Sequence, residues 1–214
     1  MTEDDTPADA ASTEGRREAR KRRTRLALHD AAVRLTSERG YNAATVADIA
    51  EAAGVSPRTF FSYYPSKEAA LYGPIDDLVH AFEDALAHRP PEIDTFTLVE
   101  QWTASAQEVV SLYPDRTASL RSVGLEADSV AAYGLRMMDR IAAAVADSLR
   151  RELGTAPGDP LPEIAAASTV SGVAAGLEVG HHHANGDDAP PHDLRRDVER
   201  AIAFARAGIA AWRG

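Results

Sequence analysis

The stretch TVADIAEAAGVSPRTFFSYYPSKEAAL, residues 45–71, decides the fold of the first part of this chain. Thr45 and Asp48 have the three-residue spacing of a capping box, which satisfies two backbone N–H groups at the start of a helix. Gly54 comes one short helix later, and glycine accepts the positive φ that a tight turn between two helices requires. The pattern therefore predicts a helix over residues 45–53 that ends in a turn at Gly54.

A second short helix is predicted directly after this turn, over residues 56–64. Ser56 is a suitable N-cap, and Pro57 occupies the first helical position, where its missing N–H has no intrahelical partner. Two helices joined in this way form a helix-turn-helix, whose second helix enters the major groove of DNA by its N-terminal end. Its outward positions carry side chains suited to contacts with bases and phosphates, namely Arg58, Thr59, Phe61, Ser62 and Tyr63.

Together with a helix predicted over residues 24–40, this stretch resembles the DNA-binding module of the TetR family of transcriptional repressors. The resemblance covers residues 24–71 almost without interruption. It includes the capping box, the Ala-Gly-Val-Ser turn, the aromatic cluster and the Pro-Ser-Lys-Glu opening of the next helix. The resemblance implies a homodimer that reads a palindromic operator on double-stranded DNA and is joined through a larger helical domain.

The resemblance also implies a role for each matching position. Arg58 and Phe61 would contact bases, and a phosphate contact without sequence specificity is the alternative role for Arg58. Many members carry Tyr-x-His-Phe at residues 61–64, so Phe61 lacks their hydroxyl and is expected to contact a thymine methyl group. Phe60 and Tyr64 match buried positions. The remaining matching residues would support the base contacts or hold phosphates, and they are Thr45, Ser56, Thr59, Ser62, Tyr63 and Lys67.

Charge is distributed unevenly over the 214 residues, whose formal net charge is −10. Residues 16–25 hold seven Arg and Lys against one Glu, whereas residues 68–214 sum to −11. A basic segment beside a DNA-binding module indicates a polyanion partner, although a solvated helix start is the alternative interpretation. The basic residues nearest the module are expected to contact phosphates, and they are Arg22, Arg23 and Arg25.

Helical patterns continue along the rest of the chain, which predicts an all-α fold of about nine helices. Residues 1–15 are expected to be a disordered acidic tail. Residues 16–67 are interpreted as a basic arm and helix-turn-helix domain, and residues 68–214 as a ligand-binding and dimerisation domain. The further predicted helices cover residues 67–88 with a kink at Gly73-Pro74, 97–112, 114–125, 129–153, 162–179 and 192–212, with a polar loop over 180–191.

The last two predicted helices are expected to form the homodimer interface. Residues 165–176 are rich in Ala, Gly and Ser, which permits close helix approach, and the final helix is amphipathic. The resemblance implies that these helices pair across a two-fold axis. Packing of both faces within one subunit is the alternative.

A small-molecule pocket is expected among the helices of residues 97–179. Their layout resembles, diffusely, the TetR branch that binds acyl-CoA-like molecules, and another lipophile without charge is the alternative ligand. Since methionines and aromatics at helical spacing are often core residues, core packing is the competing interpretation. The candidate lining residues are Trp102, Leu120, Arg121, Leu125, Tyr133, Met137 and Met138.

Composition excludes several other classes of protein. The chain has no Cys, which suits a reducing cytoplasm, and no apolar run long enough to span a membrane, so no membrane partner is expected. No common catalytic, dinucleotide-binding or phosphate-loop motif occurs, which predicts a non-enzyme without cofactor. His181-His182-His183 point in different directions, so a polar loop is favoured over a metal site. A helical carrier or enzyme that retains a helix-turn-helix corner as scaffold is the alternative function.

Overall fold

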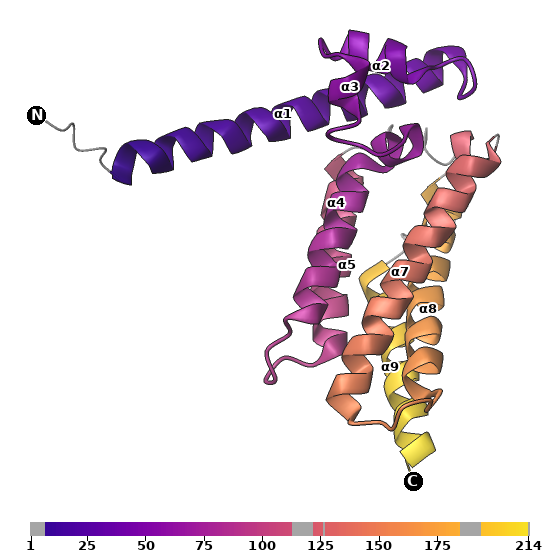
Figure 1. Ribbon diagram of the computed structural model, residues 1–214. Coiled ribbons are helices and arrows are strands. Elements are labelled where there is room, and N and C mark those ends of the chain that lie inside the picture. The colour runs from indigo at the N-terminus through magenta and orange to yellow at the C-terminus, as the bar shows by residue number, and fades with distance from the viewer. Residues whose placement is uncertain (1–6, 113–121, 126, 185–193, 214) are drawn as a thin grey trace, which may run out of the picture. The chain divides into compact units, whose positions relative to one another are not determined.

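The computed structural model describes residues 7–112, 122–125, 127–184 and 194–213, and every regular element in these ranges is a helix (Figure 1). The all-α prediction is confirmed. Residues 122–125 form a short helical segment, while most of the helix predicted over 114–125 lies outside the described residues. The helices are α1 (Pro7–Arg39), α2 (Val46–Ala52), α3 (Pro57–Phe60), α4 (Lys67–Ala87), α5 (Thr95–Leu112), α7 (Asp128–Leu153), α8 (Leu161–Ala184) and α9 (Leu194–Arg213).

The chain divides into two compact units. The first comprises Met1–Asp76 and Tyr113–Tyr133, and the second Asp77–Leu112 and Gly134–Gly214. Helices α4 and α7 therefore each contribute residues to both units. The boundary predicted between residues 67 and 68 separates a DNA-binding domain from a ligand-binding and dimerisation domain. This functional division remains a prediction.

Helix α1 differs at its start from the sequence expectation. It begins at Pro7 rather than near residue 24, so residues 7–15 of the expected acidic tail are helical. Proline is favourable in the first helical turn, and the alanine-rich residues after it have high helix propensity. The basic segment 16–25 is therefore part of one continuous helix. Gly40, with φ of 82°, ends it as predicted.

Both caps of the helix-turn-helix form as predicted. The amide of Asp48 donates to Thr45 Oγ1 at 3.2 Å, and the amide of Thr45 donates to Asp48 Oδ2 at 3.0 Å. Gly54 has φ of 70°, and Ser56 Oγ accepts a hydrogen bond from the Thr59 amide at 3.1 Å. The second helix is shorter than predicted, because α3 ends at Phe60 and the chain continues in turns towards Pro65, where a proline disfavours helix in the residue before it.

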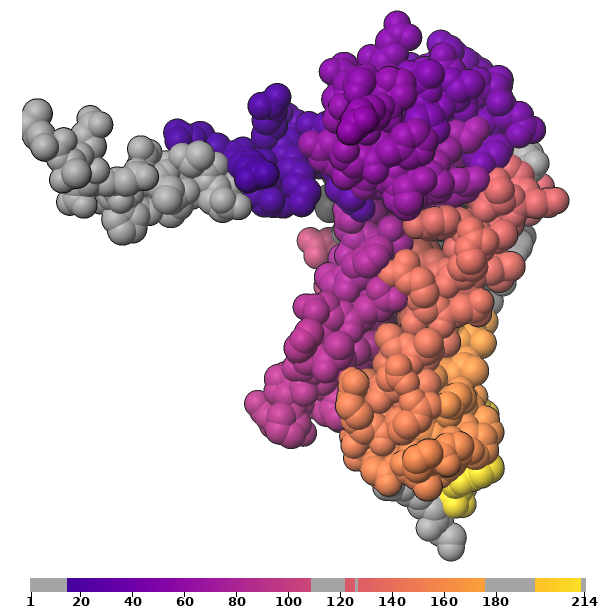
Figure 2. Space-filling model, viewed as in Figure 1, coloured from indigo at the N-terminus to yellow at the C-terminus, as the bar shows by residue number. Residues whose placement is uncertain are grey.

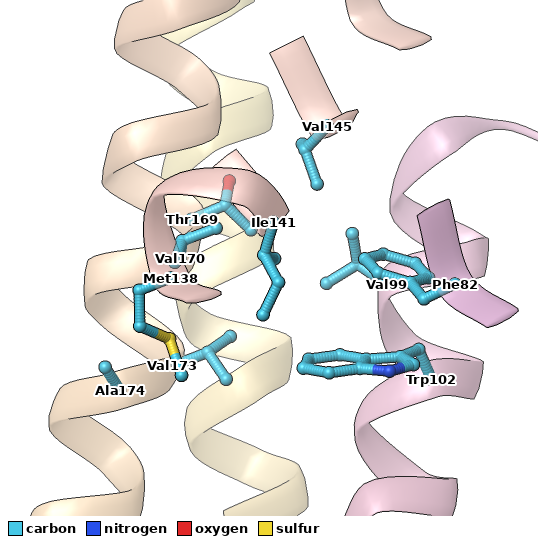
Figure 3. Close-up of a pocket in the computed structure, with 10 residues that line it drawn as sticks. All are labelled: Phe82, Val99, Trp102, Met138, Ile141, Val145, Thr169, Val170, Val173 and Ala174. Carbon is cyan, nitrogen blue, oxygen red and sulfur yellow. The ribbon is translucent and has the colours of Figure 1, made fainter. Parts of the chain in front are cut away.

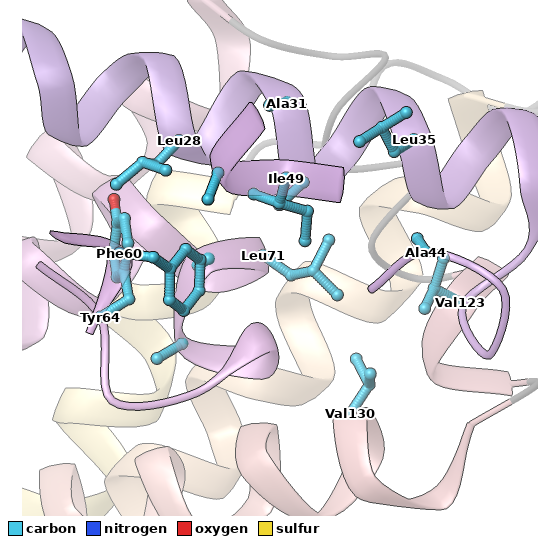
Figure 4. Packing of buried hydrophobic residues seen from close by; sticks show 14 of the residues in the cluster. Leu28, Ala31, Leu35, Ala44, Ile49, Phe60, Tyr64, Leu71, Val123 and Val130 are labelled. Atoms are coloured by element: carbon cyan, nitrogen blue, oxygen red, sulfur yellow. The ribbon is translucent and has the colours of Figure 1, made fainter. Parts of the chain in front are cut away.

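The core of the first unit is formed by apolar side chains from α1, α2, α3, α4 and the start of α7, and from the segments next to α2, α3 and α7 (Figure 4). Leu28 and Leu35 of α1 pack with Ile49 of α2 in this cluster. Phe60 and Tyr64 are almost fully buried in it, as predicted. Burial of an aromatic side chain of this kind stabilises the fold by about 1.5–3 kcal/mol. The helix-turn-helix is thereby held on α1 as one body.

The predicted kink in α4 lies at Gly73, where φ is 29° and ψ is −102°, directly before Pro74. A Cβ atom at Gly73 would lie 2.6 Å from Nδ1 of His29 on α1. The same His29 nitrogen is hydrogen-bonded to the Ala70 carbonyl at 2.8 Å. The bend is therefore packed against α1, and the contact leaves no space for a side chain at Gly73.

In the second unit, α8 and α9 approach closely, as their small residues predict. A Cβ atom at Gly172 would lie 2.7 Å from the Cβ of Ala201. Helix α8 continues to Ala184, so the predicted polar loop starts later than residue 180. The described part of the chain contains no helix long and apolar enough to cross a membrane.

A buried polar cluster joins α5 to the end of α7 in this unit. Thr95 Oγ1 donates to Glu152 Oε2 at 2.7 Å and lies 2.8 Å from Ser148 Oγ. The guanidinium of Arg89 donates to Ser148 Oγ at 3.2 Å and pairs with Glu152 at 3.6 Å. Because the buried hydroxyl groups of Thr95 and Ser148 both have partners, the cluster stabilises the contact between α5 and α7.

Candidate nucleic-acid interface

The exposed side of α3 and of the turn after it carries three of the predicted DNA contacts. Arg58 and Ser62 are exposed, and the ring of Phe61 is 58% exposed. Phe61 packs edge-on against the buried ring of Phe60, with ring centroids 5.4 Å apart. This contact leaves Phe61 exposed near the exposed Arg58, and the base contacts expected from the two residues remain a prediction.

The hydroxyl groups of Thr45, Ser56 and Thr59 belong to exposed or half-buried residues and form hydrogen bonds within the module. Thr45 Oγ1 is bonded to the Asp48 carboxylate at 2.5 Å, and the pKa of Asp48 is lowered by this hydrogen bond and by one from the Thr45 amide. Ser56 Oγ lies 2.8 Å from Thr59 Oγ1. The ionised Asp48 beside Thr45 disfavours a nearby phosphate, and the phosphate contact of Thr45 remains a prediction.

Arg25 has an internal role that sequence reasoning missed. Its guanidinium donates to the Tyr63 carbonyl at 2.7 Å and lies 4.4 Å from the centre of the Tyr64 ring. In return, the Tyr64 hydroxyl donates to the Arg25 carbonyl at 3.2 Å. Arg25 therefore positions the half-buried Tyr63 and the buried Tyr64, in the turn after α3, relative to α1. Its predicted phosphate contact remains a prediction beside this role.

Lys67 likewise lies inside the module. Its ammonium donates to the carbonyl oxygens of Tyr41 at 2.5 Å and Ala44 at 2.8 Å, and it lies 3.8 Å from the centre of the Tyr41 ring. Partial burial lowers the pKa of Lys67. Lys67 thus links the start of α4 to the loop before α2 through hydrogen bonds. The phosphate contact expected from Lys67 remains a prediction.

Glu68, the next residue, also contacts Tyr41. Its carboxylate accepts a hydrogen bond from the Tyr41 hydroxyl, which in turn accepts one from Ser129 Oγ at 2.8 Å. Burial alone would raise the pKa of Glu68, but hydrogen bonds from Tyr41, its own backbone, Ser66 and Ser129 lower the pKa to about 2. Burial and the Glu68 carboxylate also raise the pKa of Tyr41.

We expect the Glu68→Gln variant to be less stable than the parent near neutral pH, by about 1 kcal/mol, because a charge-assisted hydrogen bond is lost. The folded-state pKa of about 2 lies below the ordinary value of 4.5. The stabilisation by the carboxylate is therefore fully present above about pH 5 and is lost as the pH falls towards 2. Urea denaturation near neutral pH and near pH 3 measures how far the stability difference between variant and parent narrows. Glu51→Gln, at an exposed position of α2, is the control. A difference that stays constant over this range would contradict the role given to the carboxylate.

The basic part of α1 forms an extended cationic surface. Six exposed side chains carry the charge, namely Arg16, Arg17, Arg20, Lys21, Arg22 and Arg23. Figure 2 shows this indigo helix extending beyond the surface formed by α2 and α3. Arg22 and Arg23 are exposed on this helix, and their phosphate contacts remain a prediction, whereas Arg25 faces the module.

The family model of bacterial regulatory proteins of the TetR family matches residues 28–71 of this chain. Residues 28–71 are a TetR-family DNA-binding domain. The matched range contains the residues of the capping box, the turn and α3, together with Tyr41, Lys67 and Glu68. The contacts of Lys67 within this domain, and of Arg25 just before it, could not have been found from spacing, because their partners lie 26 and 23 residues away for Lys67 and 38 residues away for Arg25.

Individual relatives agree with this assignment. The chain is 42% identical over 90 residues to the HTH-type transcriptional regulator TcmR of Streptomyces glaucescens, covering 41% of this chain and 40% of that protein. It is 34% identical over 125 residues to the HTH-type transcriptional repressor KstR2 of Rhodococcus jostii RHA1, covering 58% and 56%. The alignments thus span about half the length of these curated relatives. The crystal structure of the TetR-family repressor FadR of Thermus thermophilus, in complex with lauroyl-CoA, shares the fold, with a TM-score of 0.51, 23% identity and coverage of 85% of this chain and 93% of that one.

The residues predicted to line a ligand pocket are only partly brought together. Trp102 and Met138 line a small apolar cavity in the second unit (Figure 3), whereas the buried Met137 is not among its lining residues. Leu125 is exposed, and Tyr133 belongs to the first unit, where its ring lies 5.1 Å from that of Tyr72. Leu120 and Arg121 lie outside the described residues, as do the side chains of His181-His183.

Proposed function

We propose that this protein is a ligand-responsive transcriptional repressor that binds a palindromic operator in the cytoplasm as a homodimer. The observation that carries the proposal is the exposed pair formed by Arg58 on α3 and Phe61 directly after α3 in a TetR-family domain, together with the cationic surface of α1. The named relatives are transcriptional regulators, which supports this function over a helical carrier or enzyme with a helix-turn-helix scaffold. Selection of bound fragments from genomic DNA tests the proposal and supplies the preferred site.

Dimerisation through α8 and α9 is supported by their exposed faces. Phe204 on α9 is 72% exposed, and Ile164 on α8 is 49% exposed. Small exposed residues surround these side chains along the two helices, among them Ala167, Ala175, Ala203, Ala207 and Gly208. Such faces permit close contact with a second copy, since two-fold interfaces pair the same surface of both subunits.

Release of DNA by a ligand would require that the ligand bind a non-binding conformation more tightly than the DNA-binding one. Two ligand classes fit this function, acyl-CoA and other lipophiles. The FadR structure contains lauroyl-CoA, which makes acyl-CoA a candidate. The cavity beside Trp102 makes an uncharged lipophile the second candidate.

Replacement of Arg58 by Ala is expected to weaken binding to the preferred site by about 1–3 kcal/mol, if the guanidinium reads a base. Binding to random duplexes should change much less, because the loss is confined to a base contact. Fluorescence anisotropy with both duplexes measures the two affinities. Arg195→Ala is the matched control, since Arg195 is exposed on α9 in the other unit. Equal losses on the two duplexes would assign Arg58 to a phosphate instead.

A further inference from the structure

Helix α4 contains a proline at a position where the helix loses one of its own hydrogen bonds. In a regular α-helix the Ala70 carbonyl accepts from the N–H of the residue four positions later, which here is Pro74. Proline has no N–H, and a buried carbonyl without a donor costs free energy. Pro74 directly follows Gly73, whose φ of 29° and ψ of −102° are not helical. A donor from outside α4 can replace the missing N–H.

His29 on α1 supplies such a donor. Its Nδ1 lies 2.8 Å from the Ala70 carbonyl oxygen, which is 41 residues away in the sequence. Because a carbonyl oxygen can only accept, Nδ1 must carry the proton in this hydrogen bond, which fixes the tautomer of the neutral ring. His29 is 5% exposed and Ala70 is fully buried. The hydrogen bond is thus shielded from water, which would otherwise compete for the carbonyl.

The packing around the bend fits the same arrangement. A Cβ atom at Gly73 would lie 2.6 Å from Nδ1 and 2.8 Å from Cγ of His29, so glycine is what allows the ring to reach the bend. Leu28 of α1 and Leu71 of α4, each next to one of the two bonded residues, lie in the core of the first unit (Figure 4). Both partners of the hydrogen bond are therefore fixed by core packing of their own helix.

The position of the bend within α4 connects this hydrogen bond to DNA binding. Helix α4 belongs to the first unit up to Asp76 and to the second unit from Asp77 onward. The bend at Gly73-Pro74 lies just before this boundary, so its angle sets the direction in which α4 leaves the DNA-binding unit. In a dimer that binds two half-sites, this direction contributes to the distance between the two DNA-binding surfaces.

We propose that His29 is a positioning residue that fixes the bend of α4 by replacing the N–H that Pro74 lacks, and that it thereby restricts the half-site spacing that the dimer accepts. The part that concerns spacing rests on the operator-binding function proposed above. The part that concerns the bend depends only on the folded protein. The two parts are therefore tested by separate measurements.

Three replacements of His29 differ in where they place a donor. The side-chain amide of His29→Asn has an N–H at the position of Nδ1, that of His29→Gln has it farther from the backbone, and His29→Leu has none. Nitrogen NMR of the imidazole rings in the full-length protein is expected to show a protonated Nδ1 for His29, whose signal is identified by its loss in His29→Asn. A His29 ring with an unprotonated Nδ1 would overturn the proposal.

The link between His29 and Pro74 is tested by a double-mutant cycle. Pro74→Ala restores a backbone N–H at this position, so the Ala70 carbonyl no longer depends on His29. In urea denaturation at one protein concentration, His29→Leu is expected to raise the unfolding equilibrium constant at least about fivefold more in the parent than in the Pro74→Ala background. The effect of leucine on packing is common to both backgrounds and cancels. Equal effects in the two backgrounds would show that His29 does not replace the missing N–H.

Binding to duplexes tests the consequence for half-site spacing. The probes are the preferred palindrome, the same palindrome with its half-sites moved apart by one or two base pairs, and a duplex that contains a single half-site. His29→Leu is expected to discriminate between the spacings about threefold less than the parent, and to bind the single half-site within about twofold of the parent. His29→Asn retains the donor, so it should discriminate as the parent does, whereas His29→Gln should resemble His29→Leu.

Unchanged discrimination in a folded His29→Leu variant would overturn the part that concerns spacing. The same loss of discrimination in His29→Asn would also overturn it, because the donor would then not be the cause. If the parent binds no duplex at all, the repressor proposal and the spacing part fail together. The NMR measurement and the double-mutant cycle decide the role of His29 in the bend in either case.

Discussion

The Phe204→Asp variant is expected to sediment as a monomer and to bind a palindromic site about 10²–10⁴-fold more weakly than the parent. Phe204 is 72% exposed in the middle of α9, among small residues that allow a second helix to approach. A carboxylate there would be buried without a partner in a two-fold interface, which strongly disfavours association. When the dimer dissociates, each copy of α3 and of the turn after it binds its half-site alone, which lowers the affinity for the palindromic site.

Phe204→Leu is the matched control for this prediction. It retains an apolar side chain at the same position, so the dimer and the DNA affinity should be largely preserved. Circular dichroism shows whether each variant keeps its helices, and melting curves are compared at equal protein concentration, since dimer stability depends on it. An intact dimer of Phe204→Asp in sedimentation would place the interface on another surface.

Neutralising the arm is expected to weaken binding to every duplex and to reduce its dependence on salt. The variant replaces six exposed cations by Gln, which preserves helix propensity, at Arg16, Arg17, Arg20, Lys21, Arg22 and Arg23. Each lost phosphate contact removes about 0.9 from the slope of log K against log salt concentration, so up to about five units of slope are at stake. The affinity at low salt is expected to fall by about 10²-fold or more.

The substitutions remove charge and keep the full length of α1, whereas a deletion of residues 1–23 would change both. The control replaces Arg195 and Arg196 at the start of α9 by Gln, which changes the net charge at a distance in sequence from both the DNA-binding domain and Phe204. Its salt dependence should match that of the parent. If the arm variant shows the parent's salt slope, α1 does not contact phosphates, and the exposed cations have another role.

Local spacing was sufficient for much of the DNA-binding domain. The capping box of Thr45 and Asp48, the positive φ of Gly54 and the cap at Ser56 each depend on residues within three or four positions. The bend at Gly73-Pro74 is of the same kind. Backbone hydrogen bonds and steric limits act over these short separations, so they can be recognised in the sequence without knowledge of the packing.

Two helix ends that lack a strong capping or breaking residue differ from the predicted positions. The extension of α1 to Pro7 was not expected from an acidic, polar segment, and α3 is shorter than the pattern of residues 56–64 indicated. In both cases the helical and the non-helical conformation differ by little free energy per residue. Composition alone could not decide between them.

The sequence by itself determined the all-α class, the two caps, the turn, the bend and the identity of the DNA-binding domain. Only the tertiary structure decided that Arg25 and Lys67 face carbonyl groups within the domain, and that Met138 rather than Met137 lines a cavity. These outcomes depend on which side chains of distant segments meet. Helical periodicity places a residue on a face of its own helix, but the partner of that face is set by the packing of all the helices together.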